Sequence, residues 1–114
     1  MLLNIVEKKL EPDITVVEVS GRLALGRESQ RIETLVDELS KKGEARVVID
    51  LTGVEYIDSA GIGMLALASG KMKEAGGKLV LVAPEGRVLQ MLKLTQMNAI
   101  LNVSGTVAEA VAAL

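Results

Sequence analysis

The sequence contains no cysteine, histidine, tryptophan or phenylalanine, and Tyr56 is its single aromatic residue. Without cysteine the chain forms neither disulfides nor thiolate metal sites. Without histidine it lacks the most common general base near neutral pH, which excludes a Ser-His-Asp triad and an ordinary zinc site. We therefore expect a protein that is not an enzyme and that holds no metal and no cofactor.

The sequence also has no large excess of charge of one sign and no long apolar run. The formal net charge is −2 and the basic residues form no block, so no stripe can follow a phosphate backbone. The uncharged run 59–70 is 12 residues long and includes three glycines, whereas a membrane span needs about 20 predominantly apolar residues. The amino terminus lacks the pattern of a signal peptide. We expect a cytoplasmic protein that binds no nucleic acid and has no membrane span.

What is present has the composition of one globular domain, because 49% of the 114 residues are hydrophobic and 25% are charged. Two strands, 2–9 and 14–19, are predicted to form a hairpin around Pro12-Asp13. Apolar residues at positions 32, 35, 36 and 39 have helical spacing and indicate an amphipathic helix that stops at Gly43.

The runs 46–51 and 78–83 are apolar without alternation, which is typical of strands covered on both faces. A helix predicted at 60–75 joins them, so at least part of the sheet is parallel. The remaining predicted elements are a helix at 87–94, a strand at 100–103 and a final helix behind a capping-box pattern at 106–109. The fold class is α/β: a mixed sheet of four to five strands with about four helices.

The stretch YIDSAGIG places Gly61 and Gly63 directly behind Asp58 and Ser59, where the 60–75 helix begins. Each glycine costs a helix about 1 kcal/mol relative to alanine. Either Asp58 or Ser59 is the natural N-cap. The glycines have two interpretations: close packing of the helix on a strand, or close approach by another molecule.

A helical wheel of this helix places Gly63, Met64 and Leu67 on or beside its polar face. One exposed leucine is normal on a protein surface, but this one is predicted to lie in a small apolar patch beside Ser59. Such a patch is a candidate docking surface. The predicted partner-binding residues are Ser59, Ala60, Gly63, Met64, Leu67 and Lys71.

The segment VVIDLTGVEYIDSAGIG, from Val47 to Gly63, strongly resembles the STAS domain, named for sulfate transporters and anti-sigma factor antagonists. The resemblance runs over residues 1–114, implies a single STAS-like domain, and includes Gly21-Arg22-Leu23 and the break at Gly76-Gly77. Free-standing chains of this size are similar to bacterial anti-sigma factor antagonists. The resemblance then implies that Ser59 is phosphorylated by an anti-sigma factor that is also a serine kinase.

The resemblance also assigns roles to the neighbours of that serine. Asp58 matches the family's acidic residue beside the phosphoserine, and Gly61 and Gly63 match the turn that lets the kinase come near. The implied cycle is partner switching: the unmodified domain binds the kinase and frees a sigma factor, and the phosphorylated domain is released. A PP2C-type phosphatase resets the cycle, and the free domain is expected to be a monomer. Ala24 departs from the family pattern, because many members have aspartate there.

Three other interpretations remain. A constitutive STAS adaptor, in a signalling or lipid-transport complex, would use Ser59 only as a helix cap, and Ala24 favours it. An enzyme with Ser59 as nucleophile is disfavoured, since Lys71 and Lys73 lie three turns or more along the helix. Nucleotide binding through Gly61-x-Gly63 lacks the fuller spacing of known phosphate-binding loops.

Overall fold

The computed structural model describes residues 3–10, 12–24 and 26–114, with side chains at 27–29 left out. It is a single α/β domain. The elements follow in this order: β1 (Asn4–Leu10), β2 (Ile14–Leu23), α1 (Arg27–Lys41), β3 (Arg46–Ile57), α2 (Ser59–Glu74), β4 (Lys78–Val82), α3 (Arg87–Leu94), the 3₁₀ helix η1 (Met97–Ala99), β5 (Val103–Ser104) and α4 (Val107–Ala112).

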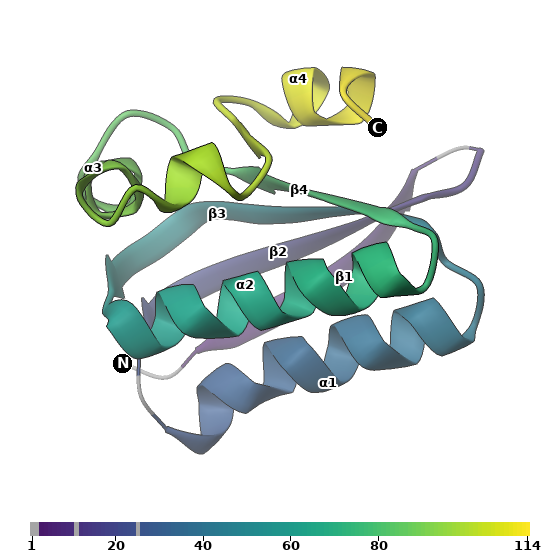
Figure 1. The fold of residues 1–114 in the computed structure, drawn as a ribbon, viewed down its shortest axis with the longest axis horizontal. Coiled ribbons are helices and arrows are strands. Elements are labelled where there is room, and N and C mark those ends of the chain that lie inside the picture. The colour runs from purple at the N-terminus through teal and green to yellow at the C-terminus, as the bar shows by residue number, and fades with distance from the viewer. Residues whose placement is uncertain (1–2, 11, 25) are drawn as a thin grey trace.

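The described strands form one sheet in the order β1-β2-β3-β4-β5. β1 runs antiparallel to β2, and all other neighbours are parallel. Helices α1 and α2 lie side by side on one face, while α4 lies on the other and α3 lies near the end of β3 (Figure 1). The predicted mixed sheet and its helices are confirmed.

The sheet is covered on both faces, and each face has its own hydrophobic cluster. The larger cluster fills the space under α1 and α2, extends to α3, and includes Leu65 of α2. The smaller one joins Val16, Val48 and Val80 to Ala110 of α4. Val47, Val48 and Ile49 have no exposed surface. The non-alternating apolar run therefore did indicate a strand buried on both sides.

Strands β2 and β3 are longer than predicted, ending at Leu23 and Ile57 instead of residues 19 and 51. The predicted strand 46–51 was too short, because Thr52 and Gly53, which follow it, lie inside β3. The register shifts there, from Glu18 paired with Asp50 to Ser20 paired with Gly53. A Cβ on Gly53 would lie 2.8 Å from the Cβ of Ser20, so this glycine lets the strands continue through the irregularity.

The strand predicted at 100–103 is also corrected, because β5 contains only Val103 and Ser104. Gln96 adopts the left-handed conformation, with φ 60°, and reverses the chain after α3. The amide of Ile100 then donates to the carbonyl of Met97, which makes this segment a helical turn. Smaller shifts are that β1 is Asn4–Leu10 where a strand was predicted at 2–9, of which residue 2 lies outside the described residues, and that α2 begins one residue earlier, at Ser59.

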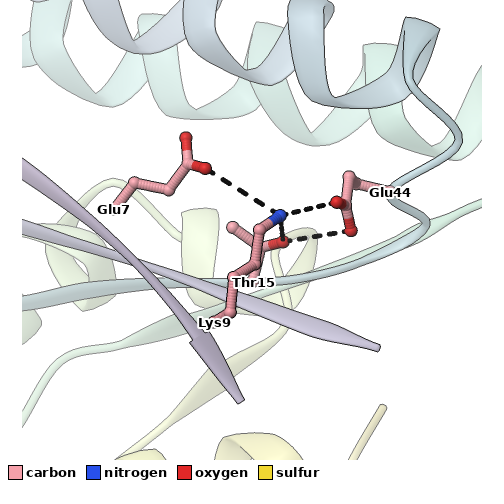
Figure 2. Close-up of polar contacts among 4 residues, drawn as sticks. All are labelled: Glu7, Lys9, Thr15 and Glu44. Atoms are coloured by element: carbon pink, nitrogen blue, oxygen red, sulfur yellow. Dashed lines mark hydrogen bonds and ion pairs between the residues drawn. The ribbon is translucent and has the colours of Figure 1, made fainter. Parts of the chain in front are cut away.

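A polar cluster joins the β1–β2 hairpin to the loop before β3 (Figure 2). The ammonium of Lys9 donates to the hydroxyl of buried Thr15 at 2.9 Å and to the carboxylate of Glu44 at 2.5 Å. Thr15 in turn donates to the other oxygen of Glu44, at 3.3 Å. The hydrogen bond from Lys9 lowers the pKa of the Glu44 carboxyl. The cluster satisfies a buried hydroxyl and fixes the hairpin to the rest of the domain.

We predict that Glu44→Gln destabilises the protein at neutral pH and that the difference disappears in acid. The folded pKa of Glu44 lies below its ordinary value of 4.5, so its ionisation favours folding above that pH. The contribution is lost as pH falls through the lowered folded pKa. Urea unfolding of both proteins from pH 7 to acid pH measures this difference. The control is Glu85→Gln in an exposed loop, and a loss of stability in Glu44→Gln that does not change with pH would contradict the prediction.

Candidate functional site

The amino-terminal end of α2 lies where β3 ends, at the edge formed by the carboxyl ends of the parallel strands (Figure 1). This edge is the usual place for binding sites in open α/β sheets. The long β2–β3 ladder ends with Leu23 paired to Ile57, immediately before the helix. The position of Ser59 is therefore fixed by two paired strands and by the helix that it begins.

Asp58 caps α2, and Ser59 is its first helical residue. The backbone of Asp58 is extended, and its carboxylate accepts a hydrogen bond from the amide of Gly61 at 2.8 Å. Of the two possible caps in the sequence, the structure selects Asp58. Ser59 is exposed, and among the described residues its hydroxyl makes no hydrogen bond. The fold therefore does not use this hydroxyl.

The two glycines of the stretch have different surroundings. Gly61 is buried, and a Cβ there would overlap the carbonyl oxygen of Leu23 and lie 3.1 Å from a side-chain carbon of Ile57. The same carbonyl accepts a hydrogen bond from the amide of Asp58 at 3.3 Å. Gly61 is thus explained by close packing of α2 on the end of β2.

Gly63, by contrast, is exposed, and a Cβ built on it meets nothing within 4 Å. The described part of the fold gives no steric reason for a glycine at this position, where it costs about 1 kcal/mol. Close approach by another molecule remains the prediction for Gly63.

The exposed side of α2 carries part of the predicted apolar patch. Leu67 is 56% exposed, two turns along the helix from Ser59, and Gly63 lies between them. Met64 is half-buried and packs against the core, and Ala60 is half-buried. The ammonium of Lys71 lies 3.7 Å from the carboxylate of Glu33 on α1. Ser59, Gly63 and Leu67 therefore share one exposed surface, to which Met64, Ala60 and Lys71 contribute less.

A contact that the sequence did not indicate joins Arg22 to Tyr56. These residues are paired across β2 and β3, and the guanidinium carbon of Arg22 lies 4.1 Å from the centre of the Tyr56 ring. Because both strands were predicted to end earlier, nothing indicated that the two side chains meet. The contact places a cation and the single aromatic residue on the two strands that lead to α2.

Within the described ranges, no group of acidic or other ligating side chains is arranged to hold a metal ion. None of the helices described here has the length and apolar character needed to cross a membrane.

Comparisons with known proteins agree on one family. The sequence profile of the STAS domain matches residues 6–110. A Thermotoga maritima protein, provisionally named an anti-sigma factor antagonist, is 26% identical over 102 residues that cover 90% of each chain. A crystal structure of a protein with that provisional name from the same organism has a TM-score of 0.81 and covers 93% of this chain and 90% of its own.

Two further structures share the fold at lower identity. An anti-sigma factor antagonist from Mycobacterium paratuberculosis has a TM-score of 0.82 at 22% identity and covers 97% of this chain and 92% of its own. The Bacillus antagonist SpoIIAA matches in its unphosphorylated form, with a TM-score of 0.71 at 15% identity over 93% of this chain and 92% of its own. Its phosphorylated form has a TM-score of 0.70 at 14% identity and covers 95% of this chain and 96% of its own.

The different surroundings of the glycines predict opposite effects of the same substitution. Gly61→Ala would force a methyl group against the Leu23 carbonyl and should lower the free energy of unfolding by about 1–3 kcal/mol. Gly63→Ala adds a methyl group in open space and should raise that free energy by up to about 1 kcal/mol. Urea unfolding of both variants measures this, and equal stabilities for the two would contradict the packing described here.

The assignment of the cap predicts a second pair of variants. Asp58→Ala removes the acceptor for the Gly61 amide and should cost about 1 kcal/mol of folding free energy. Ser59→Ala removes a hydroxyl that the fold does not use and should leave stability within about 0.5 kcal/mol of the unmodified protein. Thermal unfolding distinguishes the two, and the reverse order of stabilities would show that Ser59 is the cap.

Proposed function

The chain belongs to the STAS domain family, and we propose that it is an anti-sigma factor antagonist whose binding is controlled by phosphorylation of Ser59. The observation that carries this proposal is the exposed Ser59 hydroxyl on a helix that Asp58 already caps. A serine with no role in the fold is open to a modifying enzyme. The resemblance to SpoIIAA, which has been solved in both phosphorylation states, supports the proposal.

The proposed partner is an anti-sigma factor that is also a serine kinase and uses ATP. It contacts Ser59, Gly63 and Leu67 directly, and the absent side chain at Gly63 allows its backbone to come close. Ala60, Met64 and Lys71 lie at the border of this surface. Lys71 would exchange its ion pair with Glu33 for contacts with the partner at little cost, because exposed ion pairs contribute at most about 1 kcal/mol.

Phosphorylation would act at the interface and leave the domain itself nearly unaffected. The phosphate adds about −1.5 to −2 charge, which the start of α2 stabilises by roughly 0.3–1 kcal/mol and which Asp58 repels. Inside the domain these effects nearly cancel. Burying the dianion under a partner costs several kcal/mol unless cations meet it. A hundredfold loss of affinity needs only about 2.8 kcal/mol, so desolvation suffices.

In the cell the unmodified protein would bind the kinase in the cytoplasm, release a sigma factor and so allow transcription. A PP2C-type phosphatase would restore the unmodified state. Between partners the protein would be a monomer.

A second candidate is a constitutive STAS adaptor that binds its partner through the same surface without a phosphate switch. Ala24 favours it, since many relatives of the switching type carry aspartate at this place. Incubation with the cognate kinase and ATP, followed by mass spectrometry, distinguishes the two. Phosphate on Ser59 excludes the pure adaptor, and an unmodified Ser59 excludes the switch.

We predict that Ser59→Asp weakens binding to the cognate anti-sigma kinase by tenfold or more, while Ser59→Ala keeps it. The added carboxylate reproduces part of the charge that the interface must desolvate. Isothermal titration calorimetry measures both affinities. Thr34→Asp, at an exposed position of α1, is the matched control that adds one negative charge elsewhere on the surface. Equal affinities of the Ser59→Asp and Ser59→Ala variants would overturn the proposed mechanism.

A further inference from the structure

A second group of exposed apolar side chains lies on α3 and directly after η1, near the end of β3 (Figure 1). Leu94 is 80% exposed and Ile100 is 75% exposed, and both are more exposed than Leu67. We name Gln90, Lys93, Leu94 and Ile100 the α3–η1 surface. None of these four residues belongs to the surface defined around Ser59, and their role does not depend on the proposed phosphorylation.

This surface has a shape that a partner can use. A shallow hollow of about 350 Å³ is lined by Gln90, Lys93 and Leu94. Met91 of α3 and Met97 of η1 are half-buried and pack against the core, and flexible thioether side chains adapt readily to an apolar partner. Because Gln96 reverses the chain, η1 returns to contact α3. Leu94 lines the hollow, and Ile100 directly follows η1. Two aliphatic side chains this exposed are more than the single exposed leucine that is normal on a protein surface.

The charge around this surface indicates what it binds. On α3, Arg87 lies two turns before Leu94 and Lys93 lies directly before it, and both are exposed. They are the only charged residues in 86–108, which Glu85 and Glu109 flank. An occupant that matches this pattern presents apolar anchors flanked by carboxylates. An amphipathic helix that is apolar on one face and acidic on the other has this arrangement, and such helices commonly dock in shallow apolar grooves.

An anionic lipid surface would also offer negative charge, but the chain fits it poorly. Each cation near such a surface contributes only about 1 kcal/mol. Only two cations are available here, and the rest of the chain is acidic and would be repelled. We propose that the α3–η1 surface is a second docking site of this domain, for an acidic amphipathic helix of a partner protein.

The test uses a synthetic helical peptide with leucine on one face and glutamate on the other. Titrated into the isotope-labelled full chain, it should shift amide resonances mainly within 87–101. Leu94→Ser and Lys93→Glu should each weaken binding at least about tenfold, because they remove an anchor and reverse a matching charge. Added salt should weaken binding as well. Leu67→Ser, which removes an exposed leucine from the other surface, is the matched control and should bind normally.

Several results would overturn this proposal. The first is that Leu94→Ser binds the glutamate peptide as tightly as the unmodified protein does. The second is that a peptide with lysine in place of glutamate binds equally well, and the third is that the shifted amide resonances belong mainly to α2. Cosedimentation with phosphatidylglycerol vesicles that Leu94→Ser abolishes would assign the surface to a membrane. Self-association in analytical ultracentrifugation that the same variant abolishes would assign it to a second copy of the chain. Lys93 and Leu94 are both exposed, so their substitution should leave the fold intact, and thermal unfolding of each variant verifies this.

Discussion

The close packing of the first turn of α2 on the end of β2 is the constraint on which the site depends. Gly61 lies against the carbonyl of Leu23, and that carbonyl also accepts the amide of Asp58. A side chain at position 61 would push the helix away from the strand and break this arrangement. The carboxylate of Asp58 completes it by accepting the Gly61 amide. Together these contacts leave Ser59 as the first residue that faces outward.

This arrangement separates stability from recognition within a few residues. Asp58 caps the helix and Gly61 allows it to pack on β2. Among the described residues, by contrast, the Ser59 hydroxyl makes no hydrogen bond and Gly63 faces open space. In the proposed function, a phosphate on Ser59 would therefore change what the domain binds without changing whether it is folded. The cluster of Lys9, Thr15 and Glu44, which fixes the hairpin, lies at the start of β2, at the opposite end of that strand from Leu23.

The two candidate surfaces differ in chemistry as well as in place. The surface on α2 combines a hydroxyl, an open glycine and one exposed leucine, and in the proposed function added negative charge on the hydroxyl would control its binding. The α3–η1 surface combines two exposed aliphatic side chains with nearby cations and has no acidic residue in 86–108. A chain with an acidic net charge thus has one apolar segment, 86–108, in which both charged residues are basic. Different partners can in principle occupy the two surfaces together.

The sequence alone determined the order of strands and helices, the buried parallel strands and the family, because apolar periodicity and the DLTG…DSAGIG segment are local patterns. It also indicated the exposed Leu67. Only the tertiary structure decided that β3 continues through Gly53, since that depends on how closely Ser20 approaches. The choice of Asp58 as the cap, the reason for Gly61, and the contact of Arg22 with Tyr56 likewise depend on residues far apart in the chain. Local patterns encode which element forms, and packing between distant segments decides where each one ends and which side chains remain exposed.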